Sequence, residues 1–163
     1  MTRLAVAPLV ALAAAGCGEV VDTGFPNNYA SWCRIETYGA ATGHGDTYRI
    51  IYANDEARSY TGTGQYPAGS VLVKEVYDLS ETVEGPTPGD LQYLALMRRL
   101  DETPPGGTLY HGWLFTETDK AGGEETTYSL CFDRCHVSAP YYGAWFDYSR
   151  SAICTPRSPT AAR

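Results

Sequence analysis

Four segments rich in β-branched and aromatic residues alternate with short turn signals, and this alternation constrains the fold more than any other feature of the sequence. The segments span residues 47–52, 70–79, 93–100 and 108–116, and Pro/Gly-rich stretches at 66–69, 84–89 and 104–107 separate them. Strands at this spacing, joined by short turns, pair as antiparallel neighbours. We therefore predict an α+β domain, mostly antiparallel β-sheet with a few short helices.

Helices are predicted at three places between or after these strands. Residues 29–33 follow a loop, and Asn54 is a candidate N-cap because Asp55 and Glu56 place acids in the first turn. The longest predicted helix spans residues 126–138 and ends before Pro140. Residues 155–163 are polar, contain two prolines and are predicted to be a disordered tail.

The charge of the chain excludes one class of partner. With 12 Lys and Arg against 19 Asp and Glu, the net charge is −7 and the pI is about 4.8. Nucleic-acid binding needs a basic patch, so we expect no nucleic-acid partner. No stretch after residue 16 is apolar for long enough to span a bilayer.

The first sixteen residues have the pattern of a signal peptide. A short positive start at Arg3 precedes an apolar run over residues 4–15, and small residues precede Cys17. This resembles the lipobox of bacterial lipoproteins, although Ala14 stands where the box prefers Leu. We expect Cys17 to be lipidated, residues 17–27 to form a tether, and Gly18 to direct the protein to the periplasmic side of the outer membrane. An ordinary cleaved signal with an incidental Cys17 is the alternative.

Cys131, Cys135 and His136 form the strongest chemical motif. They read Cys-Phe-Asp-Arg-Cys-His, with three intervening residues where the c-type haem motif C-x-x-C-H has two. In that motif two thiols bond the haem vinyl groups and the following imidazole reaches the iron. The alternatives are a Cys131–Cys135 disulfide with a surface His136, or a Cys₂His zinc site without an obvious fourth ligand.

Two further cysteines remain once lipid and haem are assigned. These are Cys33 and Cys154, which bracket the predicted domain of residues 28–154. We expect them to form a disulfide, whose loop would stabilise the fold by about 4–5 kcal/mol on entropy grounds. Four cysteines allow three pairings, and the sequence does not choose among them.

Several segments resemble one family of bacterial c-type haem proteins. They are NYASW at 28–32, YRIIYANDEA at 48–57, GQYPAGSVLVKE at 64–75 and GWLF at 112–115. In this order they resemble cytochrome P460 and its relative cytochrome c′-beta, over residues 28–150. The resemblance implies a haem-attachment segment near the C-terminus of the domain and a homodimer.

The resemblance also implies roles for individual residues. His136 would be the iron ligand, and Cys131 and Cys135 would hold a covalent haem c. Lys74 matches the lysine that bonds to the haem ring in cytochrome P460, which oxidises hydroxylamine and passes electrons to an acceptor protein. Without that bond, as in cytochrome c′-beta, a five-coordinate haem binds nitric oxide. Arg49 matches a pocket arginine and, with Lys74, is a candidate catalytic residue.

Departures from the family pattern keep a second hypothesis open. Besides the extra residue between the cysteines, residues 142–146 replace the usual D-x-V-F. A haem-free structural or binding lipoprotein that kept the fold is the alternative.

Strand periodicity gives a geometric prediction for the site. Lys74 shares a strand face with Leu72 and Val76. With the roles that the resemblance implies, we predict that Lys74 and His136 face one cavity from opposite sides of a haem-sized space. The alternatives are a Lys74 side chain that reaches water along apolar surface and an Arg49 paired with a carboxylate. His44 and His111 are expected to be structural.

Overall fold

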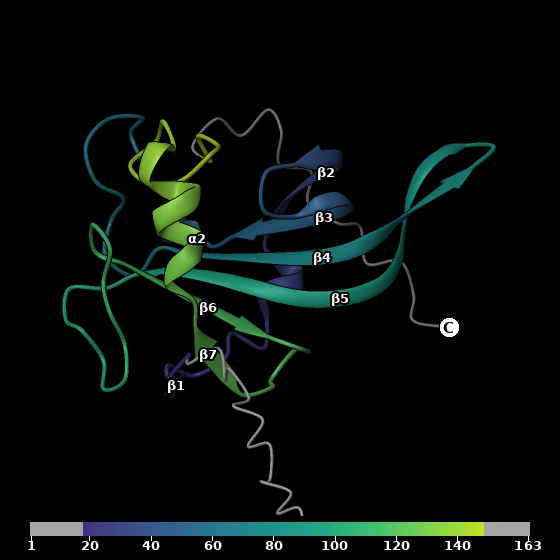
Figure 1. Cartoon of the computed structure of the whole chain (residues 1–163). Helices are drawn as coiled ribbons and strands as arrows, with labels where there is room; N and C mark the ends of the chain where they lie inside the picture. The colour runs from purple at the N-terminus through teal and green to yellow at the C-terminus, as the bar shows by residue number, and fades with distance from the viewer. Residues whose placement is uncertain (1–17, 149–163) are drawn as a thin grey trace, which may run out of the picture.

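The computed structural model describes residues 18–148, which form one antiparallel sheet with short helices (Figure 1). The strands are β1 (Val20–Val21), β2 (Cys33–Ala41), β3 (Gly45–Ala53), β4 (Val71–Thr82), β5 (Gly85–Arg99), β6 (Trp113–Thr118) and β7 (Glu125–Thr127). The helices are α1 (Asp55–Arg58) and α2 (Ser129–Arg134), with 3₁₀ turns at Tyr29–Ser31 and His136–Ser138. The strand order is β1-β7-β6-β5-β4-β3-β2, so the predicted α+β, mostly antiparallel fold is confirmed.

Each face of the sheet carries its own hydrophobic cluster. On one face, α2 and the segment after it pack on buried residues that include Ile51, Leu72, Trp113 and Phe115. On the other face, the residues before β2 cover a cluster that includes Tyr52, Val73 and Leu94. Side chains alternate between the two faces along each strand, so neighbouring residues of β4 belong to different clusters.

The predicted strands differ from the observed ones mainly in length. β3 and β4 contain the predicted strands 47–52 and 70–79 almost entirely. The predicted break at 84–89 is wrong, because β5 begins at Gly85 and continues through Pro86 and Pro88. The outer part of the β4–β5 hairpin extends beyond the sheet, where β5 has no second neighbour (Figure 1). Proline is tolerated there because its missing N–H removes no interior ladder bond.

Two other predictions need correction. The strand predicted at 108–116 begins only at Trp113, because His111 and Gly112 adopt left-handed backbone with φ of 52° and 80°. The helix predicted over 126–138 is divided: Glu125–Thr127 is a strand, α2 covers Ser129–Arg134, and a 3₁₀ turn follows. Pairing of this strand with β6 and β1 outweighs its local helix signal.

Local predictions around the first helices agree better with the structure. The Asn54 side chain accepts a hydrogen bond of 3.0 Å from the Ala57 backbone N–H, which confirms the N-cap of α1. The short helix expected at 29–33 is a 3₁₀ turn at Tyr29–Ser31. β2 was not predicted, since Gly39 and two alanines weaken its strand pattern and β2 lies at the edge of the sheet.

Some predictions fall at the ends of the chain. Cys17, Cys154 and the segments 1–16 and 155–163 lie outside the described residues. Cys33 is disulfide-bonded, but its pairing with Cys154 stays a prediction. Val20–Val21 pairs with β7, so the predicted tether contributes two residues to the sheet. Within residues 18–148, no helix combines the length and apolar character needed to cross a membrane.

A buried ion pair ties β7 to the centre of the sheet. Arg98 and Glu125 are 5% and 4% exposed, and Arg98 Nη2 donates to Glu125 Oε1 over 2.6 Å while Nη1 donates to Oε2. The Thr116 hydroxyl also donates to the carboxylate, over 2.6 Å. The pair therefore anchors the short β7, and with it the start of α2.

Glu125→Gln should reduce the free energy of unfolding by about 3–5 kcal/mol, because it leaves the Arg98 charge buried without its partner. Urea denaturation followed by circular dichroism measures the loss. Asp55→Asn is the matched control, because Asp55 is 95% exposed opposite Arg58; it should change stability by no more than about 1 kcal/mol. Equal effects of the two substitutions would contradict the importance of the buried pair.

Candidate functional site

Antiparallel pairing arranges side chains in rows across the sheet face below α2. One row contains Ile51, Lys74, Ala95 and Glu117, and the next contains Arg49, Val76 and Tyr93. Because side chains alternate, each row projects from the same face. Ala95 separates Lys74 from Glu117 with only a methyl group, so opposite charges on β4 and β6 interact across it.

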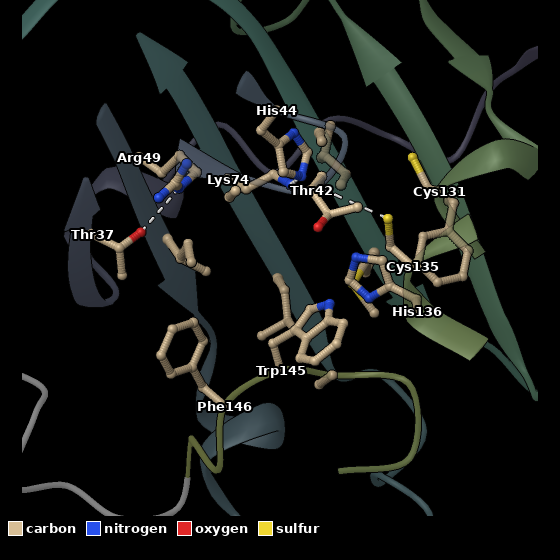
Figure 2. Close-up of a pocket in the computed structure, with 18 of the residues that line it drawn as sticks. Thr37, Thr42, His44, Arg49, Lys74, Cys131, Cys135, His136, Trp145 and Phe146 are labelled. Atoms are coloured by element: carbon tan, nitrogen blue, oxygen red, sulfur yellow. Dashed lines mark hydrogen bonds between the residues drawn. The ribbon is translucent and has the colours of Figure 1, made fainter. Parts of the chain in front are cut away.

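These rows form the floor of a cavity of about 570 Å³. The sheet supplies the floor, and the β2–β3 turn and the segment from α2 to residue 148 supply the walls (Figure 2). All five residues proposed to hold or act on the haem line it, namely Arg49, Lys74, Cys131, Cys135 and His136. These residues come from three separate segments, around residues 49, 74 and 131–136, and the fold brings the segments together. The volume of the cavity is typical of cofactor sites.

The charged residues in the cavity lining are all cations, although the whole chain carries a net charge of −7. They are Arg49, Lys74 and Arg134; among the described residues that line the cavity, none is Asp or Glu. Most of the other lining side chains are apolar, so the field of these cations is poorly screened. The cavity therefore favours a largely apolar ligand that carries negative charge.

His136 is prepared to bind a metal through one ring nitrogen. Its Nδ1 lies 2.6 Å from the Gly143 carbonyl oxygen, which only accepts, so Nδ1 carries the proton. Nε2 is then left with a free lone pair. Burial lowers the pKa of His136 to about 4, although the Gly143 hydrogen bond opposes that shift. The ring is neutral at physiological pH, as a metal ligand must be.

Gly143 was not identified from the sequence, yet it sets the orientation of His136. Its φ of 90° is left-handed, and a Cβ at this position would lie 3.1 Å from Trp113 Cδ1. The Trp113 indole also donates to the Tyr142 carbonyl oxygen over 2.8 Å, which fixes this turn. The one signal in the sequence is that Gly143 lies within residues 142–146, where the chain departs from the family pattern.

Cys131 and Cys135 are free thiols at the cavity. Cys131 Sγ donates to Glu117 Oε1 over 3.8 Å. Cys135 Sγ donates to the Thr42 carbonyl oxygen, also over 3.8 Å (Figure 2). Burial, followed by the charge of Glu117, raises the pKa of Cys131 to about 12. The alternative Cys131–Cys135 disulfide is not formed. The described residues also contain no cluster of three His, Cys, Asp or Glu able to hold zinc.

Lys74 contacts a histidine that the sequence had marked as structural. Lys74 Nζ lies 2.7 Å from His44 Nε2, and His44 comes from the β2–β3 turn. Burial lowers the pKa of Lys74 to about 8; the charge of Arg49 also lowers it, while Cys131 and Glu117 oppose the shift. Burial and the Lys74 charge lower the pKa of His44 to about 4. His44 is therefore a neutral hydrogen-bonding partner and part of the site.

Arg49 is held without an ion pair, so the alternative of a carboxylate partner is not found among the described residues. It is 7% exposed, and its guanidinium donates to Thr37 Oγ1, the Gly39 carbonyl oxygen and Thr47 Oγ1 over 2.9–3.1 Å. These neutral acceptors fix its orientation and do not neutralise its charge. Burial lowers its pKa. Arg49 therefore presents a fixed positive charge to the cavity.

His111 lies outside the cavity, as its structural role predicts. It is exposed, and its ring lies 5.0 Å from the Phe132 ring and 5.8 Å from the Tyr142 ring, measured between centroids. It packs against Phe132 of α2 and does not line the cavity that contains Lys74. Of the three histidines in the chain, the two at the cavity are His44 and His136.

Comparison with known proteins assigns the chain to a family. The family model described as Cytochrome P460 matches residues 26–141, well over half of the chain. This span includes Arg49, Lys74, Cys131, Cys135 and His136, whereas Gly143 lies just beyond it. None of the curated proteins compared with the chain matches it. A cavity suited to an apolar anion, with a neutral histidine at its wall, agrees with the match to the family model. The chain therefore belongs to the cytochrome P460 family, a family of haem-binding proteins.

Proposed function

We propose that this protein is an exported c-type haem protein whose haem is bound covalently through Cys131 and Cys135, with His136 as the iron ligand. The observation that carries the proposal is that two free thiols and a neutral imidazole with a free Nε2 line one cavity. A thiol is needed for each thioether bond, and iron needs the unprotonated nitrogen. The residues present therefore fit haem c.

The cavity also fits the rest of the ring. Its apolar lining includes Leu72, Met97, Phe115 and Phe146, which suit the faces of a porphyrin. Arg49 and Arg134 supply positive charge for the carboxylates of the haem propionates. When bound, haem would supply an iron centre that binds small ligands and exchanges electrons.

The protein's own residues would act on a small nitrogen ligand such as hydroxylamine or nitric oxide. Arg49 is fixed by three hydrogen bonds and offers its remaining N–H groups to an oxygen of such a ligand. Burial lowers the pKa of Lys74 to about 8, so its amine is able to take or give a proton at Nζ. If hydroxylamine is oxidised, the electrons pass to an acceptor protein. We further propose that the protein acts as a homodimer, as the family resemblance implies.

Covalent attachment is tested by making the full chain together with cytochrome c maturation proteins. We expect a c-type visible spectrum and a denatured mass increased by one haem. Cys131→Ser with Cys135→Ser should abolish the mass increase, while Cys33→Ser, away from the cavity, should retain it. An unmodified mass in the unsubstituted protein would contradict the proposal and favour the haem-free binding lipoprotein. With haem attached, hydroxylamine turnover against an electron acceptor would separate oxidation from nitric oxide binding.

Gly143→Ala should weaken iron binding by His136 without removing the thiols. An added Cβ meets Trp113 and strains a φ of 90°, which displaces the carbonyl that orients the ring. Loss of such a supporting hydrogen bond costs about 10–100-fold in metal affinity. The iron–histidine vibration in resonance Raman spectra, with competition by added imidazole, measures the change.

Gly24→Ala is the matched control for this substitution. Gly24 also has a left-handed φ, of 68°, but no atom lies within 4 Å of an added Cβ. It should carry similar backbone strain and leave the iron–histidine signal unchanged. An unchanged signal in a folded Gly143→Ala protein would show that the Gly143 carbonyl does not orient His136.

We also propose that the protein is anchored by lipid on Cys17 at the periplasmic side of the outer membrane. The disulfide at Cys33 supports export, because disulfides persist in oxidising compartments. Mass spectrometry of the N-terminal peptide from the outer-membrane fraction should show acyl chains on Cys17. Cys17→Ser should release the protein into the soluble periplasmic fraction. A wild-type N-terminus that begins beyond Cys17 would exclude the anchor.

A further inference from the structure

A chain of two hydrogen bonds joins Lys74 to a second depression on the protein. Lys74 Nζ lies 2.7 Å from His44 Nε2, and His44 Nδ1 lies 2.8 Å from the Tyr93 hydroxyl. Tyr93 also lines an open cavity of about 740 Å³ between β5, β6 and the start of α2. Lys74 lines only the first cavity of the two. The three side chains therefore connect two separate spaces.

The hydrogen-bonding capacity of His44 fits a connecting role. A neutral imidazole has one N–H and one lone pair, and here each ring nitrogen has a partner of its own. When Lys74 is an ammonium it donates to Nε2, and Nδ1–H then donates to Tyr93. When Lys74 is a neutral amine it accepts from Nε2–H, and the Tyr93 hydroxyl then donates to Nδ1. Both arrangements satisfy the same geometry.

We propose that His44 and Tyr93 form a proton relay between the Lys74 amine and the second cavity. A proton leaves Lys74 for His44 Nε2, the Nδ1 proton of His44 passes to the Tyr93 oxygen, and the former Tyr93 hydroxyl proton leaves to water. One proton enters and one leaves, with no change of charge on His44 or Tyr93 and no oxidation. The relay goes beyond the proposed function, because it requires no haem.

Other charged groups around Lys74 influence it without forming this chain. They face it from β3, β6, α2 and the segment after α2, and are Arg49, Glu117, Cys131, Cys135 and His136. Glu117 is the carboxylate that could compete with His44 for the Lys74 proton. It accepts a hydrogen bond from the Cys131 thiol and not from Lys74. Burial raises the pKa of Glu117, and Lys74 opposes that shift. Only His44 bonds directly to the Lys74 amine among the described residues.

Nuclear magnetic resonance of the full chain, labelled at Lys and His and prepared without haem, tests the relay. The Lys74 Cε shift reports its charge, and the two ring ¹⁵N shifts of His44 report which nitrogen carries the proton. We expect His44 to change from the Nδ1–H to the Nε2–H tautomer with the same midpoint as Lys74, near pH 8. A His44 tautomer that stays constant through the Lys74 titration would overturn the proposal.

Three variants separate a relay from a purely structural contact. Lys74→Met should abolish the tautomer change of His44 near that pH, and His111→Gln, on an exposed histidine, should leave it intact. Tyr93→Phe keeps the ring but removes the proton-carrying hydroxyl, so exchange of the His44 ring proton with water should slow. A tautomer change that persists in Lys74→Met, or unchanged exchange in a folded Tyr93→Phe protein, would contradict the relay. These measurements use no haem, so their failure is distinguishable from failure of haem attachment.

Discussion

The register of β4 between β3 and β5 is the constraint on which the site depends. Lys74 pairs with Ile51 on one side and Ala95 on the other, and this places its amine on the cavity face. Glu75, the next residue, points to the opposite face. Because side chains alternate with period two, a slip of one residue would exchange these charges between the two faces. Apolar pairs along the same ladder, such as Leu72 with Met97, hold the register in place.

The two charged neighbours on β4 are accommodated in different ways. Glu75 is 8% exposed and accepts hydrogen bonds from the hydroxyls of Tyr29, Tyr52 and Tyr77. Such a fully bonded carboxylate is a stable structural element. Lys74 has a histidine and no carboxylate as its hydrogen-bonding partner, so burial disfavours its charge. Polar groups left in this condition are expected where a protein binds or reacts, not where it only packs.

Charge is divided between the cavity and the rest of this protein. The acidic residues outnumber the basic ones, yet the charged residues in the cavity lining are cations. Arg98 and Glu125 neutralise each other on the opposite side of the sheet, so they contribute little field to the cavity. Among the described residues, neither Arg49 nor Lys74 forms an ion pair at contact distance, and this suits the carboxylates of a haem. Burial, followed by the charges of Lys74 and Arg49, lowers the pKa of His44, so the cations of the binding site also act on the proposed relay.

Much of the site was predictable because it depends on local patterns. The order Cys131, Cys135 and His136 is a motif of adjacent residues, and the face of Lys74 follows from strand alternation. The extra residue in the motif did not keep these residues from the cavity. The strands 47–52 and 70–79 were predicted because β-formers dominate them and turns bound them.

Only the tertiary structure decided the contacts between separate segments of the chain. His44 reaches Lys74 because the β2–β3 turn folds over the sheet, and Gly143 orients His136 because its turn packs on Trp113. Residues 125–127 form a strand because they pair with β6 and β1, against the local helix signal, and this pairing brings Glu125 to Arg98. The sequence by itself determined which groups carry the chemistry and which face each strand presents. Which partners those groups meet was decided by the closure of the fold, because no local pattern encodes hydrogen bonds between residues 27 to 30 positions apart, such as Arg98–Glu125, Trp113–Tyr142 and Lys74–His44.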